Sequence, residues 1–224
     1  MSESSKQLII AISREFGSGG HVIAEDLADR FGLDLYDYRI LQEIAAEKGM
    51  DIEELKRFDE KPFSRLIHRN INGYTNSVQD NIAQIEFDFM RAKASSGESF
   101  VIVGRCSDEL LSDFSSMISI FVRADEDSKL EKIMRTCNVD IEQARELQKK
   151  EDNHRRTYHN YYCSYKWGDS RHYDMCINSS VAGYKGTKSS GPTVLSTSPA
   201  DTMTSLKTMR KETFSETLPV GAKL

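Results

Sequence analysis

Three glycines lie close together near the start of the chain, in the segment SREFGSGGHVIA that runs from residue 13 to residue 24. They follow directly after the apolar run LIIAI, and apolar residues at helical spacing come next. Glycines at such a turn let consecutive backbone N–H groups converge on one point, and the start of the helix adds partial positive charge. This pattern predicts a phosphate-binding loop. The residues expected to contact a bound nucleotide are Gly17, Ser18, Gly19, Gly20, His21 and Val22.

The loop lacks the lysine on which such a loop normally ends. The standard pattern is GxxxxGK[ST], and this segment differs from it at three of the four defining positions. Arg14 stands at the first glycine, Gly20 at the lysine and His21 at the serine or threonine. Because a guanidinium suits phosphate oxygens, Arg14 is a candidate to replace the lysine in part. A tight turn without a ligand fits the same residues equally well.

Further arginines occur at two other places in the chain. Arg105 ends the apolar segment ESFVIVGR, and a charge at the carboxyl end of a buried strand lies where open α/β sheets bind ligands. Arg155 and Arg156 belong to a highly charged helical segment together with Asp152. Most charges on such a helix form a solvated face, so these residues taken alone favour a structural role.

Five short apolar segments alternate with segments of helical periodicity and must position these residues. The strands are expected at residues 7–13, 33–37, 99–104, 117–123 and 173–178. Strands that alternate with helices predict a parallel sheet with helices on both faces, which is an α/β fold of three layers. After residue 185 the composition becomes rich in Ser, Thr, Gly and Pro, which is typical of a loop or a disordered tail.

Composition excludes several classes of protein. The 224 residues suffice for one well-packed domain, and the net charge of −5 argues against non-specific binding to nucleic acid. The longest apolar run near the amino terminus has five residues, too few for a signal peptide or a membrane span, so we expect a cytoplasmic protein without membrane contact. The four cysteines and five histidines show no metal-ligand spacing, and we expect no metal site of the protein's own.

Several segments taken together resemble the cytidylate kinase-like family, a group of P-loop nucleoside monophosphate kinase relatives. The resemblance covers about residues 6–183, and its most specific pieces are ISREFGSGG near the start and KWGD, YD and INSS near the end. It is also carried by LYDYRIL, VGRCSDELL and FVRADEDSKLEKIMR. The resemblance implies a P-loop kinase fold with a five-stranded parallel sheet. It further implies ATP-dependent phosphoryl transfer, with Mg²⁺, to a nucleotide such as CMP or dCMP.

The resemblance also implies roles for individual residues. Family relatives carry a GRD segment whose arginine holds the substrate phosphate. Arg105 matches that arginine, whereas Cys106 replaces the aspartate and Asp108 lies two positions further on. The substrate-binding residues implied are Asp37, Arg39, Arg91 and Arg105. The residues implied at the transferring phosphoryl group are Arg14, Asp152, Arg155 and Arg156.

We expect a kinase-like domain over residues 1–185, with a substrate-binding insert at about 40–97 and a lid at about 136–168. The tail over 186–224 contains a pattern that favours a helix at 199–212. The missing loop lysine keeps an alternative open, namely a nucleotide- or phosphate-binding protein without kinase activity. A kinase with a non-nucleotide acceptor is a third hypothesis, because no motif is readable in the insert.

Overall fold

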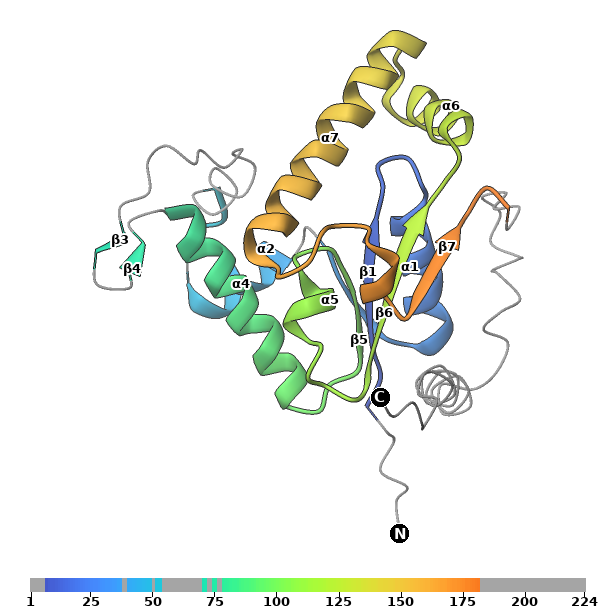
Figure 1. Ribbon diagram of the computed structural model, residues 1–224. Helices are drawn as coiled ribbons and strands as arrows, with labels where there is room; N and C mark the ends of the chain where they lie inside the picture. The colour runs from blue at the N-terminus through green and yellow to red at the C-terminus, as the bar shows by residue number, and fades with distance from the viewer. Residues whose placement is uncertain are drawn as a thin grey trace, which may run out of the picture.

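Five parallel strands form the central sheet of the computed structural model (Figure 1), which describes residues 7–37, 40–49, 51–53, 70–71, 74–75 and 78–181. The order in the sheet is β2-β5-β1-β6-β7, and every neighbouring pair is parallel. These strands are β1 (Ile9–Arg14), β2 (Asp34–Tyr36), β5 (Phe100–Val103), β6 (Met117–Arg123) and β7 (Met175–Asn178). They confirm the expected strands to within a few residues at each end.

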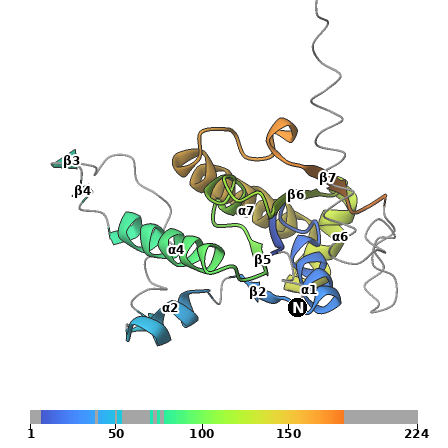
Figure 2. The same ribbon diagram turned by 90° about the horizontal axis from the view of Figure 1, so that it is seen from below.

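Helices cover both faces of this sheet, which confirms the three-layer α/β architecture. The helices are α1 (Gly20–Phe31), α2 (Ile40–Lys48), α4 (Val78–Ser95), α5 (Ser107–Leu110), α6 (Glu126–Cys137), α7 (Ile141–Tyr162) and the 3₁₀ helix η1 (Ser170–His172). Figure 2 shows α2 and α4 on one side of the sheet and α1 on the other. A short antiparallel pair, β3 (Asn70–Ile71) and β4 (Tyr74–Thr75), lies within the expected insert.

The central strand β1 is apolar from Ile9 to Ile12, where both of its faces are buried. Ile9 and Ala11 contribute to the core under α2 and α4, whereas Ile10 and Ile12 contribute to the core under α1. Successive side chains of a strand point to opposite faces, so an unbroken apolar run supplies both cores at once. The carboxyl end of β1 is therefore held firmly between β5 and β6, and the glycine loop departs from that end.

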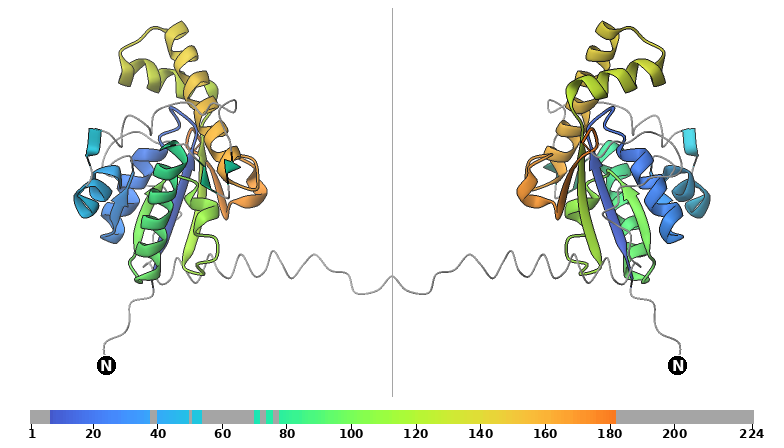
Figure 3. Two further views of the ribbon diagram at one scale, coloured as in Figure 1. Left: turned by 90° about the vertical axis from the view of Figure 1, so that its left-hand side faces the viewer. Right: turned by 90° about the vertical axis from the view of Figure 1, so that its right-hand side faces the viewer.

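Helices α6 and α7 form a hairpin that extends beyond the carboxyl ends of the strands (Figure 3). Asp140 caps α7 with a reciprocal pair of hydrogen bonds to Gln143, which fixes the turn between the two helices. A small core of Leu130, Ile133 and Ala144 holds the hairpin together, and Phe16 of the glycine loop packs against it. The expected lid thus includes α7, which contacts the loop directly.

No helix in the described part of the chain is long and apolar enough to cross a membrane. Residues 182–224, including the segment where a helix at 199–212 is expected, lie outside the described residues. Most of residues 54–77 lie outside them as well, so the limits of the insert stay a prediction.

Candidate phosphate-binding site

The glycine loop has the backbone conformation that its glycines permit. Gly17 and Gly19 have φ of 79° and 82°, in the left-handed region that favours glycine, and α1 begins immediately after Gly19. A Cβ atom added to Gly17 would lie 2.9 Å from the backbone oxygen of Lys129, so the loop packs directly on the backbone of α6. The hydroxyl of Ser18 donates to the backbone oxygen of Glu15 at 2.8 Å and closes the turn from within.

The side chain of Arg14 crosses the loop and fills the space that the side chain of a lysine at position 20 would enter. A Cβ atom added to Gly20 would lie 2.5 Å from Cβ of Arg14 and 2.9 Å from its Cγ. At the far end of the side chain, Nη1 lies 2.5 Å from the position of a Cβ atom on Gly104. Arg14 therefore runs from the start of α1 to the turn after β5, and both glycines make room for it.

Two further arginines converge on Arg14. Arg155, from α7, donates from Nη1 to the backbone oxygen of Arg14 at 3.1 Å, and its guanidinium lies over the ring of Phe16. Burial, together with the positive charges of Arg155 and Arg105, lowers the pKa of Arg14 to about 9, and the negative charge of Asp37 opposes this change. Like charges in a partly desolvated place repel one another, and a bound polyanion would relieve that repulsion.

The turn after β5 holds Arg105 in an unusual backbone conformation. Arg105 and Cys106 both have φ of 56°, which costs a residue with a side chain about 1–2 kcal/mol. Arg105 forms an ion pair of 3.1 Å with Glu86, a carboxylate of α4 that is only 1% exposed. Left-handed conformations at non-glycine residues are concentrated at ligand sites, and here they accompany a fixed guanidinium at the edge where ligands bind.

Asp108, two positions after Cys106, is buried and bonded to residues near the end of α7. Its Oδ2 accepts a hydrogen bond from the hydroxyl of Tyr165 at 2.9 Å and lies 3.0 Å from Nε2 of His159. Burial lowers the pKa of His159, but its bonds to Asp108 and Cys163 more than offset this and raise the pKa to about 10. The buried pair of Asp108 and His159 consequently ties α5 to the end of α7.

Asp152 supports the glycine loop through a hydrogen bond to the loop backbone. Its Oδ1 accepts a hydrogen bond of 2.7 Å from the backbone N–H of Phe16. Burial raises the pKa of Asp152, while the Phe16 amide and the charge of Arg155 act in the opposite direction. One turn of α7 therefore contributes an acceptor and a donor to the loop backbone, through Asp152 and Arg155.

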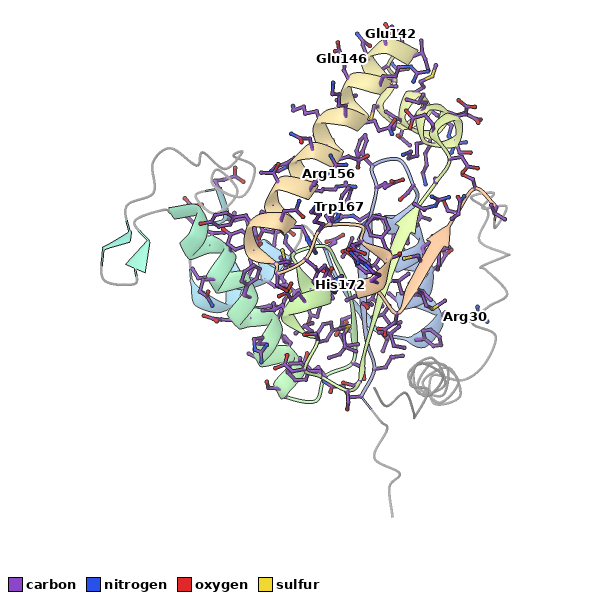
Figure 4. The ribbon with its side chains drawn as sticks, in the orientation of Figure 1. Arg30, Glu142, Glu146, Arg156, Trp167 and His172 are labelled. Carbon is purple, nitrogen blue, oxygen red and sulfur yellow. The ribbon has the colours of Figure 1, made fainter. Side chains whose placement is uncertain are left out.

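The structure does not bring Arg91 to this cluster. Arg91 lies near the carboxyl end of α4 and forms an ion pair of 2.7 Å with Asp113. It also donates to the backbone oxygen of Leu110. Arg156 is exposed, and its guanidinium lies over the ring of Trp167, as the labelled side chains in Figure 4 indicate.

The remaining expected residues lie beside the loop or outside the described part of the chain. His21 begins the first turn of α1 with Val22, and its Nε2 lies 3.7 Å from Oδ2 of Asp37 and 3.4 Å from Glu25. Asp37 follows β2 and is 3% exposed. Arg39 lies outside the described residues.

Two residues near the site were absent from the sequence-based expectations. Glu86 forms an ion pair with Arg105. The sequence contained a signal for this contact, because Glu86 lies between the buried Ile82 and Phe89 on α4 and a charge on an apolar helix face needs a partner. Lys132 of α6 places its Nζ 2.9 Å from the position of a Cβ atom on Gly19. No pattern within the charged segment of α6 distinguishes Lys132 from its neighbours.

A glycine loop after the central strand of this sheet order, with arginines gathered around it, assigns the protein to the P-loop kinase class. The chain belongs to the cytidylate kinase-like family, whose model matches residues 9–181. This result confirms the resemblance seen in the sequence. Family and fold together support a kinase-like phosphotransferase that binds nucleotides.

Individual relatives agree with the family. The chain is 25% identical over 176 residues to a cytidylate kinase of Pyrococcus horikoshii, covering 78% of this chain and 81% of the relative. It is 24% identical over 168 residues to a cytidylate kinase of Methanopyrus kandleri, covering 70% and 78%. A crystal structure of an uncharacterized protein from Eubacterium ventriosum is 35% identical, with a TM-score of 0.62, and the match covers 94% of this chain and all of that one.

Proposed function

We propose that this protein transfers a phosphoryl group from ATP to a nucleoside monophosphate, with CMP or dCMP as the acceptor. The observation that carries the proposal is the convergence of Arg14, Arg105 and Arg155 between the glycine loop and the turn after β5. The similarity to the cytidylate kinases of Pyrococcus horikoshii and Methanopyrus kandleri supports the choice of acceptor.

The proposed site divides the work of phosphoryl transfer among its cations. This reaction needs little covalent chemistry from the protein, but it needs in-line positioning and positive charge around the transferred group. In our proposal the backbone N–H groups of residues 19–21 hold the donor phosphates, and Arg105 holds the acceptor phosphate. Arg14 reaches from one to the other, so its guanidinium would face the transferring group. Arg155 adds a second charge from α7.

Glu86 and Asp152 would preorganise this arrangement before substrates bind. Glu86 fixes the guanidinium of Arg105, and Asp152 fixes the loop through the Phe16 amide. Groups that are already in place cost no reorganisation at the moment of reaction, which is the main source of electrostatic catalysis. The contacts of α7 with the loop would also help to exclude water, so that ATP is not simply hydrolysed.

Mg²⁺ would neutralise negative charge on the phosphate oxygens when it is bound. The described residues contain no group of three His, Cys, Asp or Glu side chains able to hold a metal ion. Mg²⁺ in kinases takes most of its ligands from water and phosphate, with one or two carboxylates from the protein. Asp37 fits that requirement, because it is a buried carboxylate beside His21 at the start of α1. We assign Asp37 as the protein ligand.

Incubation of the purified chain with ATP, Mg²⁺ and a panel of nucleoside monophosphates tests the proposal. We expect ADP and a nucleoside diphosphate in equal amounts, with CMP or dCMP as the preferred acceptor. If a diphosphate forms only with another nucleotide, the proposed acceptor is wrong but the proposed type of reaction still holds. ATP binding without any diphosphate product, across all acceptors, would instead establish a nucleotide-binding protein without kinase activity.

A further inference from the structure

Lys132 reaches the glycine loop from the side opposite to the turn after β5. It lies in α6, which follows β6, whereas Arg14 extends toward Gly104 after β5. In the sheet β1 lies between β5 and β6, so the two cations approach the loop from its two flanks. Nζ of Lys132 is 2.9 Å from the position that a Cβ atom on Gly19 would occupy.

The position of Lys132 is built into the fold. The backbone of α6 touches the loop at Gly17, where an added Cβ atom would lie 2.9 Å from the Lys129 oxygen and 3.0 Å from the Ile133 side chain. Gly19 makes room for the ammonium group of Lys132 in the same way that Gly20 makes room for Arg14. A side chain at either glycine would push a cation away from the loop.

Lys129 and Lys132 lie three residues apart on α6 and have different surroundings. Nζ of Lys129 lies 3.1 Å from Glu15 and 3.5 Å from Glu126, so that charge is committed to carboxylates of the protein. Nζ of Lys132 approaches the glycine backbone at the start of α1. Burial lowers the pKa of Lys132, and the neighbouring charge of Arg135 lowers it further. A bound anion would oppose both effects, because it would favour the charged form of the Lys132 amine.

We propose that Lys132 binds the polyphosphate of the donor nucleotide, on the flank of the loop away from the acceptor. This inference rests on the proposed function for the identity of the donor. It divides the role of the single missing loop lysine between two cations. Arg14 serves the side that faces Arg105 and the acceptor, and Lys132 serves the side that faces α6.

Binding measurements with variants of two lysines test the inference. Lys132→Ala and Lys132→Met, which keeps most of the aliphatic stem, are compared with Lys149→Ala, a matched loss of an exposed lysine on α7. The probes are ATP, inorganic tripolyphosphate and CMP, with calorimetric detection and a thermal unfolding control. We expect both Lys132 variants to bind ATP and tripolyphosphate at least about tenfold more weakly, as expected for the loss of a charge-assisted hydrogen bond. CMP affinity and the Lys149 variant should be unchanged.

Three outcomes would overturn the inference. One is unchanged affinity of a folded Lys132 variant for ATP and tripolyphosphate. Another is an equal loss of affinity for CMP, which would indicate a general effect on the site. The third is failure of the unsubstituted protein to bind either polyphosphate. A protein that binds ATP through Lys132 but forms no diphosphate would refute the proposed function and support this inference.

Discussion

Arg14 and Gly20 share a space that has room for only one side chain. Cβ of Arg14 lies 2.5 Å from where a Cβ atom on Gly20 would stand, a separation that two such atoms do not adopt. In the pattern GxxxxGK[ST] the first of these positions is glycine and the second is lysine. Here the cation and the glycine have exchanged positions, so the missing lysine and the added arginine are a single compensated change.

This exchange predicts that the double variant Arg14→Gly/Gly20→Lys retains nucleotide binding that each single variant loses. Gly20→Lys alone should destabilise the loop by collision, and Arg14→Gly alone should remove the cation, each weakening ATP binding by roughly 100-fold. In the double variant the lysine enters the vacated space, and we expect affinity within about tenfold of the unsubstituted protein. Calorimetric titration with ATP measures this. If the double variant loses as much binding free energy as the two single variants together, the interpretation that the arginine and the lysine exchange positions is wrong.

Gly104→Ala should impair the site more than it impairs stability. Its Cβ atom would collide with Nη1 of Arg14, whereas a Cβ atom on Gly97 would meet nothing within 4 Å. Both glycines have positive φ, 79° and 86°, so both variants should lose about 1 kcal/mol of unfolding free energy from backbone strain. Only Gly104→Ala should lower kcat/KM, by about tenfold or more. Equal activity of the two variants would argue against a role for the Arg14 guanidinium.

Asp152→Ala should loosen the glycine loop. It leaves the partly buried N–H of Phe16 without its 2.7 Å acceptor, which costs about 1–3 kcal/mol of unfolding free energy. Asp152→Asn keeps an acceptor oxygen and should recover most of that stability. Urea unfolding of both variants gives the comparison. Full activity of the Asn variant would identify Asp152 as a positioning residue, and a stable but inactive Asn variant would indicate that its charge acts in the reaction.

Stability should depend on pH through His159. Its pKa in the folded protein is about 10, above the ordinary value of 6.5. A raised pKa means that the folded state holds the proton more tightly than the unfolded chain does. The contribution of His159 should therefore be complete below about pH 6.5 and should disappear as the pH rises through about 10. The difference in unfolding free energy between the unsubstituted protein and His159→Gln measures this contribution. A difference that stays constant over that range would show that the imidazole is not charged in its pair with Asp108.

Arg105 and Arg91 should differ in their effect on the acceptor. Arg105→Gln is combined with Glu86→Gln, so that no buried carboxylate is left unpaired. We expect this pair of substitutions to weaken CMP binding by about tenfold or more, with Glu86→Gln alone as the control. Arg91→Ala loses an exposed ion pair with Asp113, worth about 0–1 kcal/mol, and a hydrogen bond to the Leu110 backbone, and it should bind CMP normally. A loss of CMP affinity in the Arg91 variant would show that Arg91 does contribute to acceptor binding.

The sequence by itself determined the elements of this fold and the location of the loop. Unbroken apolar runs mark strands that are buried on both faces, and Ile9 to Ile12 supply the two cores in alternation. Gly17 and Gly19 mark the loop because few other residues adopt its backbone conformation. Arg105 was predictable for a similar reason, since the carboxyl end of a parallel strand is where these sheets bind ligands. Each of these signals lies within a short stretch of chain.

Only the tertiary structure decided which side chains meet. Arg91 and Glu86 lie on the same helix, yet Glu86 reaches Arg105 and Arg91 pairs with Asp113. Asp108 is committed to His159, and Lys132 gained its place at Gly19 only because α6 packs across the loop. These contacts join residues that are far apart in the chain. Periodicity identifies the buried face of a helix, but the partner on that face depends on how helix and sheet pack together, and local sequence does not encode that choice.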